Sequence, residues 1–260
     1  MSLFTSVQSE LVKTKRSASF WMSLLGAGVI PLIFLLVYII SPEKTAPSLQ
    51  KTPWEIHFFQ GYQQFASFLL PMFVILICSQ IPQIEYKNNT WKQVFASPQS
   101  IGNIFFSKYI AIMLMVLFLF LMYNIFMLLA AVIPNLVRKE FTFLDNPVNW
   151  KQLFRLNLKT FISLLAIISI QYWLSLRFKN FIVAIGLGLA LLITSIMMFG
   201  FQWEHVYKVP YAFPLLSLTG MVEKGEGGPL FLNHELNSIG YFIFFTVLAF
   251  LDMKYRKERG

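Results

Sequence analysis

Few side chains in this sequence have the type and spacing that catalysis or metal binding requires. The 260 residues include one cysteine, Cys78, and three scattered histidines, His57, His205 and His234. A single cysteine excludes a disulfide within the chain and any site built from several cysteines. The sequence also contains no H-E-x-x-H, G-x-S-x-G or Walker A motif. We therefore expect a protein that is not an enzyme, with no catalytic, cofactor-binding or metal-binding residues of its own.

The polar side chains that remain of interest are neutral and lie inside long apolar stretches. Such residues usually hydrogen-bond one membrane helix to another, and this is the main expectation here. The alternative is that they line a pathway for an amphiphilic substrate. The candidates for that role are Gln63, Gln64, Asn124, Gln171 and Thr194.

The elements that must position these residues are membrane helices. Hydrophobic residues make up 57% of the chain and charged residues only 13%, which nearly excludes a water-soluble fold. Six apolar stretches contain no Lys, Arg, Asp or Glu, and each approaches the roughly 20 residues needed to cross a bilayer. They predict an all-α polytopic membrane protein, a single domain over residues 1–260, with spans at about 20–40, 62–81, 109–133, 160–176, 181–200 and 236–251.

The distribution of Lys and Arg predicts the orientation of these spans. Six spans place both termini on one side, and basic residues are about twice as dense in the segments of that side as in the others. We therefore expect cytoplasmic termini, and we attribute the net charge of +9 to topology rather than to nucleic-acid binding. The exception is the basic third loop, 134–159, for which we expect a surface helix near the lipid headgroups.

Three segments outside the spans have structure of their own. Apolar residues at helical spacing over 3–11 predict an N-terminal helix in the cytoplasmic interface. Residues 211–222 are apolar but too short to cross, and a turn follows at 223–229, so we expect an outer re-entrant hairpin that leads into the last span. Pro31 and Pro71 are expected to kink the first two spans.

The loop at 82–108 contains the third of these segments, a short helix. Thr90 and Gln93 have the spacing of a capping box, which predicts a helix that starts at Trp91. Ser97-Pro98 should end that helix, and Pro98 suits the first turn of the next one. Trp91, Val94 and Phe95 would share one face. This face would either anchor the loop in the membrane interface or fill a groove in a partner protein.

The segment from Glu85 to Lys108 resembles a known family in the order of its residues: Glu, Thr-Trp-Lys, Ala-Ser-Pro, Ser and Lys. It is similar to the cytoplasmic loop in permease subunits of type-2 ABC exporters, particularly the lantibiotic-immunity and multidrug branch. Residues 9–17, just before the first span, resemble the same family. The resemblance implies six spans, cytoplasmic termini in the bacterial cytoplasmic membrane, an interfacial N-terminal helix and an outer hairpin before the last span.

The resemblance also implies partners and roles. The chain would be a permease subunit that forms the substrate pathway with a second, identical or homologous permease chain, driven by two copies of an ABC ATPase subunit. ATP and magnesium would bind in the ATPase, which fits the missing Walker A motif. The residues expected to couple the two are Glu85, Thr90, Trp91, Lys92, Val94, Phe95 and Pro98. The alternative is a non-transporting scaffold or assembly subunit of a membrane envelope complex, while charge-free spans disfavour a secondary carrier.

Overall fold

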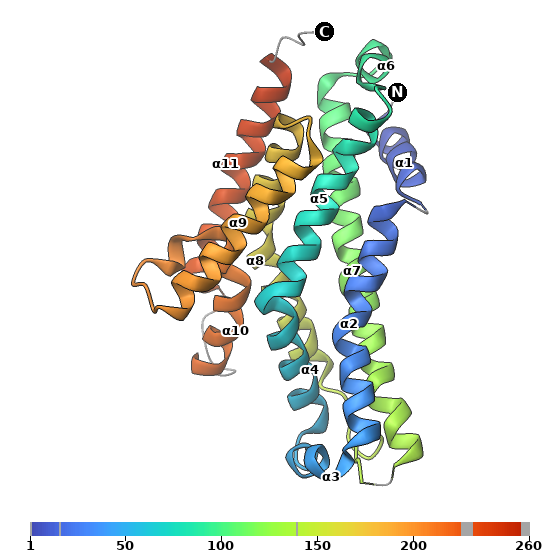
Figure 1. Cartoon of the computed structure of the whole chain (residues 1–260), viewed down its shortest axis with the longest axis vertical. Coiled ribbons are helices and arrows are strands. Elements are labelled where there is room, and N and C mark those ends of the chain that lie inside the picture. The colour runs from blue at the N-terminus through green and yellow to red at the C-terminus, as the bar shows by residue number, and fades with distance from the viewer. Residues whose placement is uncertain (1, 16, 139, 225–230, 256–260) are drawn as a thin grey trace.

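The computed structural model of the chain is an elongated bundle of helices (Figure 1). It describes residues 2–15, 17–138, 140–224 and 231–255, and over these ranges it contains helices and no strand. The expected all-α polytopic membrane fold is therefore confirmed. Six helical segments are long and apolar enough to cross a membrane, namely α2 (Ala18–Ile40), α4 to α5 (Pro53–Lys87), α7 (Ile101–Val137), α8 (Trp150–Arg177), α9 (Phe181–Gly200) and α11 (Asn233–Tyr255).

Several of these helices extend well beyond the apolar runs. Helix α7 has 37 residues, which corresponds to about 55 Å and exceeds the roughly 30 Å of a bilayer core. Helix α8 begins at Trp150, ten residues before the apolar stretch. The prediction of a separate surface helix in the third loop is therefore wrong, because Lys151, Arg155 and Lys159 lie on the first turns of α8. This extension also makes α8, with 28 residues, longer than the apolar stretch at 160–176.

The second span is interrupted by a change of helix type. Helix α4 (Pro53–Gln64) continues through one π-helical stretch, η2 (Phe65–Leu69), into α5 (Leu70–Lys87). A proline ring collides with the carbonyl group four residues earlier, and for Pro71 that residue is Ser67, inside η2. The wider π turn relieves this collision. By contrast, α2 remains one helix through Pro31.

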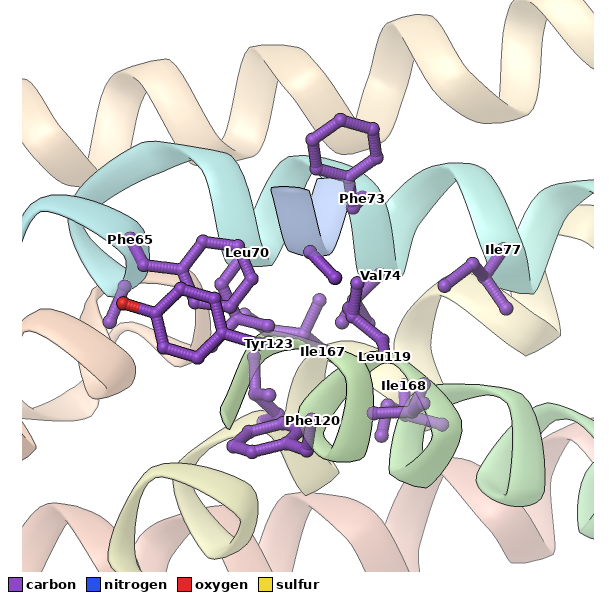
Figure 2. Packing of buried hydrophobic residues seen from close by; sticks show 14 of the residues in the cluster. Phe65, Leu70, Phe73, Val74, Ile77, Leu119, Phe120, Tyr123, Ile167 and Ile168 are labelled. Carbon is purple, nitrogen blue, oxygen red and sulfur yellow. The ribbon is translucent and has the colours of Figure 1, made fainter. Parts of the chain in front are cut away.

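The core lies where η2, α5, α7 and α8 meet, as Figure 2 shows. Phe65 stacks on Tyr123, with ring centroids 4.1 Å apart, and both side chains are fully buried. Helix α2 packs on α7, and α11 packs on α8. A close approach between α2 and α5 requires Gly26, since a Cβ atom there would lie 2.6 Å from the Phe73 ring.

The remaining elements are short. Helix α1 (Leu3–Thr14) precedes the first span, α3 (Pro42–Thr45) and η1 (Ala46–Leu49) follow it, and α6 (Trp91–Ala96) lies before α7. Helix α1, helix α6 and the last turns of α11 lie at the same end of the molecule (Figure 1). The expected hairpin corresponds to η3 (Val206–Lys208), η4 (Pro210–Ala212) and α10 (Phe213–Lys224). The turn expected at 223–229 lies mostly outside the described residues, as does the basic tail after Tyr255.

Candidate functional site

Helix α6 forms where the sequence predicts it, but not for the predicted reason. The Thr90 side chain makes no capping hydrogen bond, so the expected capping box is wrong. Instead, Asn89 adopts a left-handed backbone conformation with φ of 52°, and the Thr90 N–H donates to the Glu85 carbonyl group at 3.0 Å. This tight turn ends α5 and starts α6. Asparagine tolerates that conformation better than most residues.

The end of α6 is only partly as predicted. The helix ends at Ala96, before Ser97-Pro98, which confirms the stop signal. The placement of Pro98 in the first turn of the next helix is wrong, because α7 begins at Ile101. Its N-cap is Ser100, whose hydroxyl oxygen accepts a hydrogen bond from the Asn103 N–H at 3.1 Å.

The aromatic face of α6 points into its own chain. The Trp91 side chain is only 8% exposed, and its ring lies between those of Tyr86 and Phe95, at centroid distances of 5.2 and 5.4 Å. Val94 and Phe95 are half-buried. Burial of this face fixes α6 to the bundle. The side chains that α6 leaves exposed are Lys92, Gln93 and Ala96.

Beneath Trp91 lies a buried cluster of four charged residues from three helices. The Lys108 ammonium group, on α7, is fully buried and contacts Glu85 on α5 at 2.7 Å and Glu10 on α1 at 3.0 Å. Lys13 bridges the same two carboxylates, at 2.8 Å to Glu10 and 3.0 Å to Glu85. Two acids and two bases balance one another, which offsets the cost of burying charge. Lys108 also lies 5.5 Å from the centre of the Trp91 ring, a cation–π distance.

Lys13 has the most exposed side chain of these four residues, at 35%. Partial burial alone would lower its pKa, but the adjacent carboxylates of Glu10 and Glu85 outweigh burial and raise the pKa above 10.5. Lys13 therefore stays charged at neutral pH. Helix α1 is thus joined to α5 and α7 by ion pairs, so its role goes beyond lying in the membrane interface.

Sequence reasoning named Glu85 and Trp91 but missed Glu10, Lys13 and Lys108 as parts of this site. Lys13 and Lys108 contribute to the Lys and Arg distribution that predicts the orientation of the spans, and Glu10 lies in the segment 9–17 that resembles the family. None of the three is marked by the sequence as part of an ionic cluster. Glu10 and Lys108 are 98 positions apart. No local pattern links two residues at that separation.

Two of the candidate pathway residues are engaged within the bundle. The Gln171 side chain is fully buried and donates to the Ser79 hydroxyl at 2.9 Å and the Ala184 carbonyl group at 2.8 Å. The Asn124 amide donates to the Asn157 side chain at 2.7 Å. Both residues therefore bond helices to one another, which was the main expectation for this group.

The other three candidates are exposed. Gln63 and Gln64 lie on α4, and Thr194 lies on α9, where its hydroxyl donates to the Ala190 carbonyl group at 2.8 Å. Gln60 and the half-buried Ser67 extend the α4 pair with helical spacing, so that four polar residues follow one face of the second span. An uncovered stripe of this kind is unfavourable in contact with lipid.

A second buried ion pair lies where α8, α10 and α11 meet. Lys159 contacts Glu235 at 3.3 Å, and the same carboxylate accepts hydrogen bonds from the Leu232 N–H at 2.9 Å and the Ser217 hydroxyl at 3.2 Å. Lys159 and Glu235 each lie one position before an apolar stretch, so neither falls inside a predicted span. For this reason the sequence does not predict the ion pair. Likewise, the candidate membrane spans Pro53–Lys87 and Asn233–Tyr255 are longer than the apolar stretches and include His57 and His234. No group of three or more His, Cys, Asp or Glu suited to a metal occurs in the described parts of the chain.

Six membrane helices, with a helix before the first span and a short helix between the second and third, define a polytopic membrane protein. A family model described as ABC-2 family transporter protein matches residues 6–196, well over half of the chain. The chain belongs to this family and is a membrane component of an ABC transporter. A comparison with curated proteins found no match. The matched region includes all four residues of the cluster beneath α6 and ends within α9.

Proposed function

We propose that this chain is the permease subunit of an ABC exporter in the bacterial cytoplasmic membrane, with both termini cytoplasmic. It forms the substrate pathway with a second permease chain, identical or homologous. Two separate ATPase subunits bind ATP and magnesium and dock on the exposed face of α6. Family membership supports an ABC ATPase as partner. The 260 residues contain no Walker A motif, which fits a partner chain that binds the ATP.

The observation that carries the proposal is the way α6 is held. Its Trp91 ring packs on Tyr86 and on the Lys108 ammonium group, and Lys108 in turn binds α1 and α5 through carboxylates. A displacement of α6 is therefore transmitted to three helices at once. Reversing a 1:99 population between two arrangements of these helices needs about 5.5 kcal/mol, which closure of an ATPase dimer around ATP can supply.

The polar stripe on the second span supports a role in the pathway. Gln63 and Gln64 are exposed at membrane depth, where uncovered amide groups are costly. A second permease chain that faces this stripe across a polar pathway would remove that cost. Thr194 is the candidate from α9. The engaged side chains of Asn124 and Gln171 leave these three as the residues we assign to the pathway.

The docking test uses the exposed face of α6. Trp91→Asp is a poor probe, because burial of this side chain means that the variant will lose chain stability as well. The double variant Lys92→Glu/Ala96→Glu changes exposed positions only, and we expect it to weaken co-purification of the ATPase at least tenfold at normal chain abundance. The matched control is Lys44→Glu/Ser48→Glu at the far end of the molecule. Full ATPase recovery with the α6 variant would refute docking at this helix.

The topology is tested with single cysteines in a Cys78→Ser background. Cysteines at the exposed positions Ser48 and Asn89 lie at opposite ends of the bundle. An impermeant thiol reagent applied to intact cells should label the cysteine at Ser48 and spare the one at Asn89. Labelling of the cysteine at Asn89 alone would show the opposite orientation, with α6 outside the cell, where a cytoplasmic ATPase could not dock on it.

A further inference from the structure

A large groove opens beside α6, at the end of the molecule where the last turn of α11 and the turn between α8 and α9 also lie (Figure 1). Its volume is about 1490 Å³, more than the roughly 300–1,000 Å³ of a typical small-molecule pocket. We call it the α6 groove. The residues that carry charge along it are Glu85, Lys87, Lys92, Arg177, Lys179, Asp252 and Lys254.

The two acidic residues of the α6 groove are already neutralised. Glu85 is held by Lys13 and Lys108, and Asp252 accepts from Arg177 at 3.1 Å. The four lysines of the groove, in contrast, form no ion pair with any carboxylate of the described residues, and all four are exposed. The groove therefore presents unbalanced positive charge and favours an anion. These lysines are Lys87, Lys92, Lys179 and Lys254.

The same groove has apolar and aromatic walls. Trp91 and Phe95 line it from α6, Leu176 from the end of α8, and Met253 and Tyr255 from the end of α11. It lies at the ends of three membrane helices, the level at which lipid headgroups meet the protein. Basic pockets between membrane helices at this level recognise anionic headgroups, with lysines on the phosphate and apolar walls beside the first carbons of the lipid.

We propose that the α6 groove binds the headgroup of an anionic phospholipid, with Lys87 and Lys179 contacting its phosphate group. This site adjoins the exposed face of α6 that we assign to the ATPase and shares Lys92 with it, so Lys87 and Lys179, which lie outside α6, are the residues that distinguish the two sites. The groove volume leaves room for the glycerol region as well as the phosphate. Bound lipid would contact both α6 and the ends of α8 and α11. The ion pairs of the cluster beneath α6 involve only α1, α5 and α7, so they do not connect α6 to α8 or α11.

The test uses the full chain, purified and delipidated, with binding measured by native mass spectrometry. The probes are phosphatidylglycerol and phosphatidylcholine with the same acyl chains. We expect phosphatidylglycerol to bind and phosphatidylcholine to bind far more weakly. The double variant Lys87→Gln/Lys179→Gln should weaken phosphatidylglycerol binding roughly 30-fold, about fivefold for each lysine. Neither lysine has an ion-pair partner among the described residues, so the variant should fold normally, and its melting temperature verifies this.

The matched control is Lys44→Gln/Lys51→Gln, which removes the same charge from two exposed lysines at the opposite end of the molecule. This control should bind phosphatidylglycerol like the natural chain. Equal loss in both variants would overturn the proposal, because it would show only general attraction to anionic lipid. A further arm adds soluble glycerol phosphate as competitor. Full displacement of phosphatidylglycerol by an equal concentration of glycerol phosphate would assign the groove to a soluble phosphate. Unchanged phosphatidylglycerol binding by Lys87→Gln/Lys179→Gln would assign these lysines to another ligand, such as an acidic segment of the ATPase. Either result would overturn the proposal of a lipid site.

Discussion

The two buried ionic clusters differ in what they join and in how completely they are satisfied. The cluster beneath α6 connects α1, α5 and α7 through two acids and two lysines, and one carboxylate oxygen, Oε2 of Glu85, has no hydrogen-bond partner. The pair of Lys159 and Glu235 connects α8 to α11, and its carboxylate also binds a backbone N–H and a hydroxyl group. The first cluster spans more of the fold and is the less completely satisfied.

This difference lies in the number of buried polar atoms that lack a hydrogen-bond partner at each end of the molecule. The Nε1 atom of Trp91 is likewise buried without a partner, next to the same cluster. A displacement of α6 would therefore break no hydrogen bond at these two atoms, because neither atom makes one. Both oxygen atoms of the Glu235 carboxylate have partners, so movement of α10 or α11 would break existing contacts.

The largest expected effect comes from Lys108→Met. This change leaves Glu10 and Glu85 buried with only the half-exposed Lys13 between them, and loss of one partner from a buried ionic cluster typically costs about 3–5 kcal/mol. We expect the free energy of unfolding, measured in mixed micelles titrated with a denaturing detergent, to fall by that amount.

The control for Lys108→Met is a triple variant that adds Glu10→Gln and Glu85→Gln. Removing both carboxylate charges should restore much of the lost stability, because the penalty comes from unpaired buried charge and not from the missing lysine itself. A single variant that loses less than about 1 kcal/mol would show that the cluster does not hold the three helices together.

A smaller effect is expected for Lys159→Met. Loss of the lysine leaves the Glu235 carboxylate buried without a cation, which typically costs about 3–5 kcal/mol. The hydrogen bonds that Glu235 accepts from Leu232 and Ser217 remain and offset part of that cost, so we expect a loss of about 2–3 kcal/mol. Lys151→Met is the matched control on the same helix, where the side chain is exposed and the expected change is within about 0.5 kcal/mol. If Lys159→Met costs more than Lys108→Met under the same unfolding conditions, the ranking of the two clusters is wrong.

The sequence is enough to predict the six spans, because a helix must have about 20 apolar residues to cross the hydrocarbon core of a bilayer, and stretches of about that length are visible in the sequence. It underestimates the helices themselves. Residues 150–159 carry Lys151, Arg155 and Lys159 and therefore look like a separate surface helix, whereas they form the first turns of α8, which packs against α11 and α4. Apolar periodicity carries no information about these contacts.

The site could be predicted only in part, for a related reason. The end of α6 at Ser97-Pro98 is a local signal that the sequence shows directly. The start of α6 depends on the left-handed turn at Asn89, whereas the spacing of Thr90 and Gln93 wrongly predicted a capping box there. The direction of the Trp91 ring is set by Lys108, which becomes a neighbour only when α5 and α7 pack together. Pairings between distant segments decide the chemistry of this site, and a single sequence does not reveal them.

The smallest effect is expected for Lys13→Met, within the same cluster as Lys108. Its side chain is 35% exposed, so solvent screens its ion pairs and their loss should cost less than about 1 kcal/mol. Because the two carboxylates raise the pKa of Lys13 above 10.5, its contribution is complete below the unfolded pKa and is lost as pH rises through the higher folded value. The difference in free energy of unfolding between the natural chain and Lys13→Met should therefore be complete at neutral pH and disappear once the pH exceeds the raised folded pKa of Lys13. A cost as large as that of Lys108→Met, or one unchanged at alkaline pH, would show that Lys13 belongs to the closed part of the cluster and not to its solvent-facing edge.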